Sequence, residues 1–305
     1  MIGVTGATGM IGGRVVDSLL SAYPMARLRC LVRHPGLVPR SERIEILVGD
    51  LISEPDCAEF ANGLDIVLHL AQSNNPAASD RHWPSDCSAN MITSLNLLDA
   101  LRATGRRVHV VFASSGGAVY GQREGIAYYD ESMPCAPLSA YGIQKLALEN
   151  YLSLGVAQGW MSGCALRISN AFGAALPPER RQGLIGVAAS RHRLEQPVEI
   201  FGSDETVRDY VHVDDIAAAF LAAMHRDVGF EAVNISSGVG HSVREILAML
   251  GEVSGREVDV KRIDFGSRQF ALTPRMVLCN AKAERIFGWV PRIPLSEGLT
   301  RLWND

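Results

Sequence analysis

Three glycines at the N-terminus, Gly6, Gly9 and Gly12, constrain the fold of this chain more than any other feature. They come after an apolar run at residues 2–5, which predicts a strand, and lead into residues 11–21, which predict a helix. A tight turn here requires glycine, a diphosphate requires a backbone without side chains, and a helix N-terminus supplies positive potential. A glycine-rich turn alone can be only a tight turn, so the binding of a dinucleotide here depends on the downstream elements.

Alternation of strands and helices continues through the first half of the chain. Further strands are expected at residues 27–32, 44–48, 65–71, 108–113 and 164–168, and helices at 85–103 and 140–156. The strands are apolar without alternation, which is typical of a parallel sheet covered on both faces. We therefore expect an α/β fold, a Rossmann-type doubly wound parallel sheet whose ligands lie at the carboxyl ends of the strands.

After about residue 170 the alternation of strands and helices becomes less regular, and prolines separate shorter elements. We expect a dinucleotide-binding domain at residues 1–172, with a return segment near 205–235. Residues 173–204 and 236–305 should form a smaller C-terminal substrate-binding lobe. Because no repeat or low-complexity linker separates the two parts, they should pack together.

Composition narrows the classes of function. The 305 residues are 47% hydrophobic and carry a net charge of −4, which fits a large core and argues against a nucleic-acid partner. No apolar run is long enough for a membrane span, and the first strand begins at once, so neither a membrane segment nor a signal peptide is expected. The six cysteines are scattered and the histidines show no ligand spacing. We therefore expect a cytoplasmic protein with reduced thiols and no metal.

Tyr141 and Lys145 indicate chemistry on the helix at 140–156. Residues four apart share a helical face, so the ammonium of Lys145 can hold the phenol of Tyr141 partly ionised. Such a pair is common by chance. Its weight comes from the glycine turn before it and from Ser114 and Ser115, which end a strand between the two motifs.

The three features in this order resemble the extended short-chain dehydrogenase/reductase superfamily. Two later segments, L-R-I-S-N-A-F-G at 166–173 and V-R-D-Y-V-H-V-D-D at 207–215, resemble blocks of its NAD-dependent epimerase/dehydratase family. The likeness extends over the whole chain and is strongest to UDP-sugar 4-epimerases. It implies an enzyme that epimerises C4 of a UDP-sugar, or of another NDP-sugar, through a transient 4-keto intermediate with bound nicotinamide.

The resemblance also implies catalytic roles. Tyr141 would remove the proton of the sugar hydroxyl, and Lys145 would lower the pKa of the tyrosine and hold the nicotinamide ribose. The hydroxyl donor would be Ser115, with Ser114 in reserve, because Gly116 stands where many members carry Ser or Thr. Gly116 and Gly117 would leave room for the keto sugar to turn over.

For the cofactor, the resemblance implies contacts from Tyr141, Lys145, Gly6, Gly9, Met10, Ile11, Gly12, Arg33, Asp50, Leu51, Leu70, Ala71 and Asn90. Asp50 would bind the adenine, although it could instead cap a helix. Arg33 stands where NAD-specific members carry an acid, and an arginine can pair with a 2′-phosphate. The habit of the family favours NAD, and Arg33 keeps NADP as the alternative.

Substrate contacts are implied for Ser115, Asn170, Arg208 and Arg268, with the two arginines on the diphosphate. Arg275 is a rival for the second arginine, because the motif around Arg268 matches only in part. Family members also pair as homodimers through a four-helix interface. The helices at 85–103 and 140–156 would form it here. Candidate contacts are Leu95, Leu98, Leu146 and Tyr151, although any of them could instead face the sheet.

Two other functions stay open. Gly117 and Ala118 occupy the positions where sugar dehydratases carry an acid pair, which disfavours elimination. An NAD(P)H-dependent reductase or dehydrogenase of a 4-keto-6-deoxy nucleotide sugar needs the same residues, and Arg33 supports it. A catalytically silent dinucleotide-sensing protein fits less well, because the chain keeps Tyr141, Lys145 and Arg208.

Overall fold

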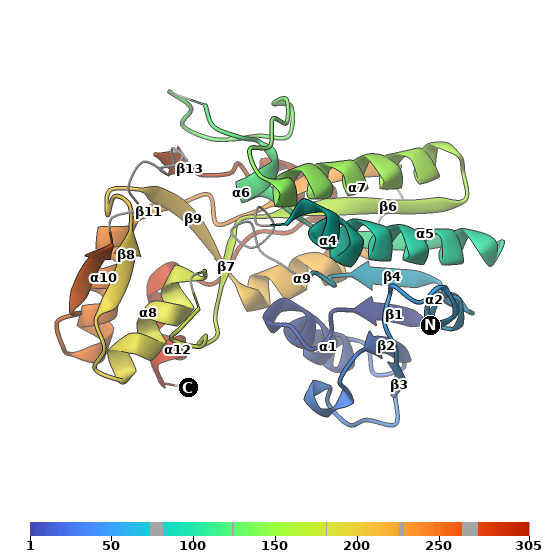
Figure 1. Ribbon diagram of the computed structural model, residues 1–305, viewed down its shortest axis with the longest axis horizontal. Coiled ribbons are helices and arrows are strands. Elements are labelled where there is room, and N and C mark those ends of the chain that lie inside the picture. The colour runs from blue at the N-terminus through green and yellow to red at the C-terminus, as the bar shows by residue number, and fades with distance from the viewer. Residues whose placement is uncertain (74–81, 124, 181, 226–228, 264–273, 305) are drawn as a thin grey trace.

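A seven-stranded parallel sheet forms the core of the larger part of the molecule, on the right in Figure 1. The computed structural model describes residues 1–73, 82–123, 125–180, 182–225, 229–263 and 274–304. From one edge of the sheet to the other, the strands are β10 (Phe230–Ile235), β6 (Met161–Ile168), β5 (Val108–Ser115), β4 (Ile66–His69), β1 (Ile2–Thr5), β2 (Leu28–Val32) and β3 (Ile44–Val48). This confirms the predicted fold class. The strand order reverses between β1 and β4, and the crevice at the carboxyl ends of these strands is where ligands of such sheets bind.

Helices cover both faces of this sheet. On one face, α1 (Met10–Ala22), α9 (Val213–Ala223) and α11 (Ala281–Phe287) contribute Leu19, Phe220 and Phe287 to a buried apolar cluster. On the other face, α2 (Glu54–Ala61), α5 (Thr93–Ala103) and α7 (Ala140–Ala157) contribute Phe60, Leu97 and Leu152 to a second cluster. Two buried clusters explain why the strands between them are apolar on both sides.

The helix expected at residues 85–103 is present, with a π-helical turn inside it. The structure has a short helix α4 (Trp83–Cys87), a π-helical turn η2 (Ser88–Ile92) and only then α5. Within this turn, the Asn90 amide donates to the carbonyl and the carboxylate of Asp86. Apolar periodicity does not reveal such a turn, because one inserted residue leaves the pattern on either side intact.

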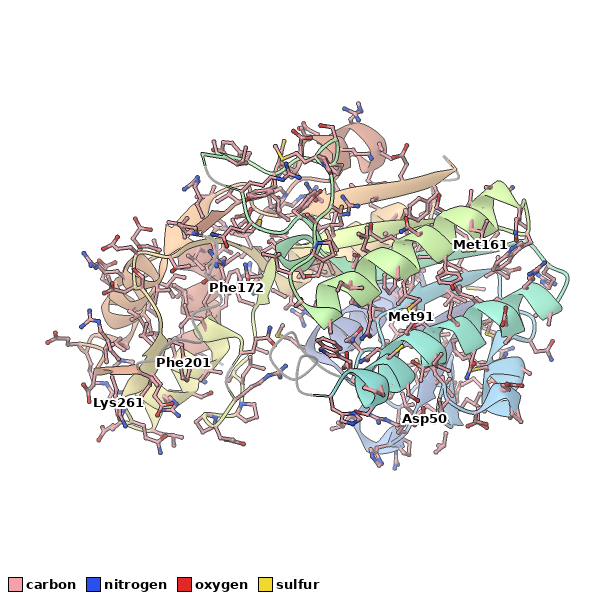
Figure 2. All side chains as sticks on the ribbon, turned by 45° about the horizontal axis from the view of Figure 1, so that its top comes forward. Asp50, Met91, Met161, Phe172, Phe201 and Lys261 are labelled. Carbon is pink, nitrogen blue, oxygen red and sulfur yellow. The ribbon has the colours of Figure 1, made fainter. Side chains whose placement is uncertain are left out.

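The remaining elements form two smaller sheets with their own helices. β9 (Val207–His212) pairs with β7 (Asn170–Phe172), β11 (Gly240–Ser242) and β13 (Arg275–Met276), and β8 (Val198–Phe201) pairs with β12 (Val260–Ile263). They pack with α8 (Leu184–Arg193), α10 (Val243–Ser254) and α12 (Leu295–Asn304) around a third cluster. Phe172 of that cluster lies between this lobe, which carries Phe201 and Lys261, and the large sheet (Figure 2).

Two short elements complete the described chain, η1 (Pro35–Leu37) and α6 (Gly116–Val119). The six cysteines are free. None of the helices in the described ranges has both the length and the apolar character needed to cross a bilayer.

Candidate active site

The glycine turn packs the start of α1 against the end of β4. Gly6 has a φ of +74°, and a Cβ there would lie 2.7 Å from the backbone nitrogen of Ala71. A Cβ on Gly12 would lie 2.0 Å from the carbonyl oxygen of Gly6. The first turn of α1 has neither an acidic residue nor a side-chain cap, so its amides face the turn with their positive potential unopposed. This arrangement suits a diphosphate at the helix N-terminus.

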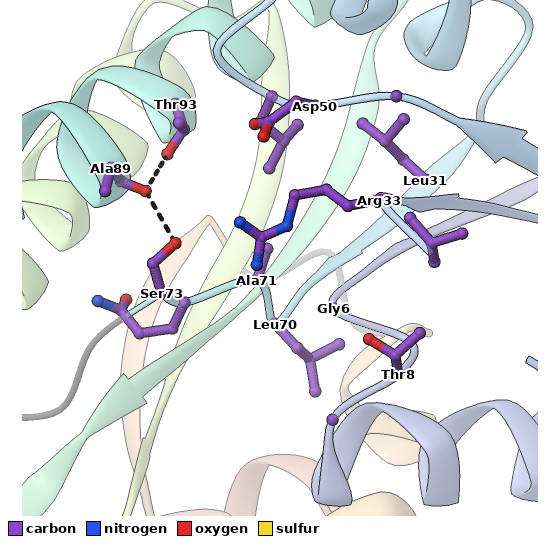
Figure 3. A pocket seen from close by; sticks show the side chains of 15 residues that line it. Gly6, Thr8, Leu31, Arg33, Asp50, Leu70, Ala71, Ser73, Ala89 and Thr93 are labelled. Carbon is purple, nitrogen blue, oxygen red and sulfur yellow. Dashed lines mark hydrogen bonds between the residues drawn. The ribbon is translucent and has the colours of Figure 1, made fainter. Parts of the chain in front are cut away.

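Beside the turn lies a cavity of about 220 Å³. Among the predicted cofactor residues, it is lined by Gly6, Gly9, Arg33, Asp50, Leu51, Leu70 and Ala71. The Arg33 side chain extends across it, between Asp50 and Ala71 (Figure 3). Asp50 does not cap a helix, because the N-cap of α2 is Ser53, whose side chain accepts from the amide of Asp56. The alternative interpretation of Asp50 is therefore wrong.

A second cavity, of about 450 Å³, opens beyond the turn. It shares Gly6, Gly9, Leu70 and Gln72 with the first, so the two cavities adjoin at the glycine turn. Its lining includes Met10, Ile11, Gly12, Ser114, Ser115, Tyr141, Lys145 and Asn170. The structure thus brings the predicted dinucleotide site, the hydroxyl pair and one substrate residue together. A dinucleotide with its diphosphate at the start of α1 would have one cavity on either side of the glycine turn.

Tyr141 and Ser115 both line the second cavity, and the hydroxyl of Ser115 lies beside the phenol. Burial raises the pKa of Tyr141, and the hydrogen bond with Ser115 opposes that effect in part. From the sequence, Lys145 was predicted to lower the pKa of Tyr141. The structure differs, since the Lys145 ammonium lies 5.6 Å from the centre of the phenol ring and donates to the carbonyl of Ala113 at 2.7 Å.

Lys145 is buried, with only 3% of its surface exposed. Burial lowers its pKa to about 7, while the carboxylate of Glu149 raises it. The ammonium also lies 4.6 Å from the ring centre of Phe112, which favours the cation. The pKa of Lys145 therefore lies near neutral pH, within the cavity that it lines.

The two serines face different partners. Ser114 donates to the carboxylate of Glu149, whereas Ser115 contacts the phenol of Tyr141. A side chain at Gly116 would require Leu278 to move, because a Cβ would lie 2.3 Å from its Cδ1. Of the two serines, Ser115 is the one whose hydroxyl lies beside the phenol of Tyr141, while Ser114 is bound to Glu149. The expectation that Gly116 leaves space for the sugar is wrong, since Leu278 fills it; beside Gly117 nothing lies within 4 Å.

Asn90 lines neither of these two cavities. It is 3% exposed, and its oxygen accepts from the backbone amide of Ser73 at 2.8 Å. Its amide nitrogen donates to Asp86, whose second oxygen accepts from Gln144 at 2.7 Å. Asn90 thus supports the loop after β4, which lines both cavities through Leu70 and Gln72. Any effect of Asn90 on a cofactor is indirect in this arrangement.

On the lobe side, Asn170 and Tyr210 are paired neighbours on β7 and β9 and both line the second cavity. Arg208 lies two residues before Tyr210, on the same face of β9, but it lines neither cavity. Its guanidinium donates to the carbonyl of Val207, and burial lowers its pKa. Arg275 pairs with β9 nearby and donates to the carbonyl of Ala127. Arg268 lies outside the described residues.

Several lining residues were not predicted as site residues: Thr8, Leu31, Gln72, Arg180, Gln182, Gly183 and Tyr210. Tyr210 could have been found, because it lies two residues from Arg208 on an extended segment and so shares its face. Arg180 and Gln182 lie between β7 and α8, where no periodicity tells which side chains face the cavity.

Comparisons with known proteins agree with this geometry. The model of the NAD-dependent epimerase/dehydratase family matches residues 2–236. The chain belongs to this family. It is 30% identical to the UDP-glucose 4-epimerase of Mycolicibacterium smegmatis, over 98% of this chain and 96% of the relative. It is also 27% identical to the GDP-6-deoxy-D-mannose reductase of Pseudomonas aeruginosa, over 99% and 95%. The family therefore includes relatives that epimerise and relatives that reduce.

Solved structures of family members superpose on nearly the whole chain. The UDP-glucose 4-epimerase of Thermotoga maritima with UDP-glucose has a TM-score of 0.90 at 29% identity, covering 99% of this chain and 97% of that one. The UDP-glucose 4-epimerase of Thermus thermophilus with NAD has a TM-score of 0.89 at 28% identity, with the same coverage. The predicted family is confirmed.

Proposed function

We propose that this protein epimerises C4 of a UDP-sugar with a bound NAD. The observation that carries the proposal is that Tyr141, Ser115 and Lys145 line one cavity together with the glycine turn and Asn170. A hydroxyl pair there can act on one sugar carbon beside the nicotinamide. Relatives named UDP-glucose 4-epimerases, and their structures with UDP-glucose or NAD, support this assignment.

The roles of the side chains follow from their positions. NAD, when bound, supplies the hydride acceptor and donor. Tyr141 takes the proton of the sugar hydroxyl and later returns it, and Ser115 donates to the developing carbonyl oxygen. Lys145 supplies a buried positive charge beside them. Asn170 and Tyr210 orient the substrate from the lobe, while Arg208 is proposed to reach the diphosphate as the substrate binds.

The test is interconversion without a reductant. We expect the purified protein to retain NAD and to convert a UDP-hexose or UDP-N-acetylhexosamine into its C4 epimer, measured by separation of the two sugars. The nicotinamide absorbance should show no net change, because the cofactor ends each cycle oxidised. Tyr141→Phe, which removes only the hydroxyl, should bind NAD but leave the sugar unchanged.

A second function has one observation in its favour. Arg33 extends into the cavity that would hold the adenosine, which suits the 2′-phosphate of NADP, and a reductase of a 4-keto-6-deoxy sugar releases its nicotinamide after each turnover. Steady consumption of NADPH with such a sugar, together with no interconversion of UDP-sugars, would decide for this alternative.

We also infer that two copies pair through α5 and α7. On α7, Ile143, Tyr151 and Leu154 are each about half exposed, a spacing that places apolar side chains on its outer surface. Of the four dimer contacts predicted from the sequence, the one at Leu98 is wrong, because this side chain is buried against the sheet. Leu95 and Leu146 also pack partly inward.

The six free cysteines fit the reducing cytoplasm expected for such an enzyme.

A further inference from the structure

We propose that Glu149 is a positioning residue of the catalytic centre: its buried carboxylate holds the strand end that carries Ser115 and faces Lys145 one helical turn away. The proposal rests on the assignment of Tyr141, Ser115 and Lys145 as the reacting groups. It gives a function to a buried charge that the proposed chemistry does not otherwise use.

Glu149 is 2% exposed, and its carboxylate is held by two side chains. Arg167 on β6 donates to both of its oxygens, with distances of 3.1, 3.1 and 2.7 Å. Ser114 at the end of β5 donates to Oε1. Arg167 also donates to the hydroxyl of Tyr120, which donates to Asn234. A buried, hydrogen-bonded carboxylate of this kind has a defined position.

This anchor determines which serine reaches the substrate. Successive side chains of a strand point in different directions. Because Glu149 binds the hydroxyl of Ser114, the next residue, Ser115, is presented to Tyr141. The same strand end provides the Ala113 carbonyl that accepts from Lys145. Glu149 therefore connects the positions of all three reacting groups.

Glu149 also bears on the charge of Lys145. The groups that face this ammonium are Tyr141 on its own helix, Phe112 and the Ala113 carbonyl on β5, and His69 on β4. His69 is buried and its pKa is lowered to about 3, so it adds no charge near neutrality. Burial lowers the pKa of Lys145, and Glu149 opposes this. Arg167 on β6 pairs with Glu149 and is the other charged group beside this carboxylate.

Loss of the negative charge at position 149 makes the ammonium of Lys145 less favourable, so the pKa of Lys145 falls further. Lys145 then loses its proton at a lower pH than in the wild type. If the ammonium is required, the alkaline limb of the pH–rate profile moves to lower pH as well.

The chain offers a direct measurement, because it contains only three lysines, Lys145, Lys261 and Lys282. In the full protein with lysine labelled by ¹³C, the side-chain resonances can be followed against pH by NMR. We expect the Lys145 resonance to titrate at lower pH in Glu149→Gln than in the wild type, with Lys282 unchanged. This readout needs no substrate, so it stands even if the epimerase assignment fails.

Glu231→Gln is the matched control. Glu231 pairs with Lys282 at 2.6 Å and lies outside both cavities. This change removes a carboxylate from a different lysine, so it should leave the Lys145 resonance, and the activity, as in the wild type. In Glu149→Gln we expect kcat to fall about 10- to 100-fold, with KM changed much less.

A folded Glu149→Gln protein whose Lys145 titrates as in the wild type would overturn the proposal, whatever its activity. Loss of one partner of a buried ion pair can prevent folding, since the other charge is left unpaired. In that case the double variant Glu149→Gln with Arg167→Met removes both charges. There we expect a smaller shift of the Lys145 resonance in the same direction, because the nearer negative charge is lost together with the positive charge of Arg167. A Lys145 that titrates as in the wild type in both variants would equally overturn the proposal.

Discussion

Ser114 and Ser115 are chemically identical neighbours, but their hydroxyls have different partners in the structure. Ser114 is 4% exposed and donates to Glu149, so its hydroxyl is already used inside the protein. Ser115 contacts the phenol of Tyr141 in the cavity. A hydroxyl that must serve a developing oxyanion has to be free of a stronger internal acceptor, and only Ser115 of the two meets that condition.

The first prediction compares these two residues. Ser115→Ala should lower kcat by about 100-fold, because it removes the donor to the developing carbonyl. Ser114→Ala should cost less activity, and about 1 kcal/mol of stability from the lost hydrogen bond. Steady-state kinetics and denaturant unfolding of both variants measure this. A greater loss of kcat in Ser114→Ala would reverse the assignment of the two hydroxyls.

At the scale of elements, the start of α6 is shaped by a contact from a distant segment. Leu278 is fully buried and lies against Gly116, where a Cβ would be 2.3 Å from its Cδ1. A Cβ on the neighbouring Gly117 would meet no atom within 4 Å. The same helix therefore contains one glycine required by packing and one that packing does not require.

This difference gives the second prediction. Gly116→Ala should destabilise the protein by about 1–3 kcal/mol, because Leu278 or the backbone of α6 must move. Gly117→Ala in the same helix is the control and should have no such cost. Thermal or denaturant unfolding of both variants measures the difference. Equal stability of the two variants would show that Leu278 adjusts without strain.

At the scale of the whole molecule, the site lies where the large sheet meets the smaller lobe. The glycine turn, Tyr141 and Lys145 come from the large sheet and its helices, whereas Asn170 and Tyr210 come from the sheet of the lobe. Between these parts, Asp209 accepts from Ser169 and Ser237 and is fully buried. These buried hydrogen bonds fix the position of the lobe side of the cavity relative to the large sheet.

The third prediction concerns assembly. We expect a dimer by light scattering at micromolar concentration, and Leu154→Glu should convert it to a monomer, because a charge would enter an apolar interface. Met25→Glu is the control, since Met25 is 93% exposed and lies between α1 and β2, away from α7. A monomeric wild type, or a Leu154→Glu dimer as stable as the wild type, would contradict the proposed interface.

The sequence by itself determined the parallel sheet, the glycine turn and the pair of Tyr141 and Lys145. These are local patterns: a strand, a turn or one helical face is set by residues within a few positions of each other. The predicted strand at residues 44–48 and the predicted helix at 140–156 agree with β3 and α7 within one residue. Family resemblance added the choice of Ser115 over Gly116, but not its cause.

Only the tertiary structure decided how distant residues share the site. A Cβ at position 116 would meet Leu278, and the Asn90 oxygen accepts from the amide of Ser73. The carboxylate of Glu149 accepts from Arg167 and Ser114. No short-range pattern encodes these contacts, because each joins segments that are far apart in the chain and meet only when the sheet and its helices have packed. Their outcome depends on volume, burial and hydrogen bonding in three dimensions.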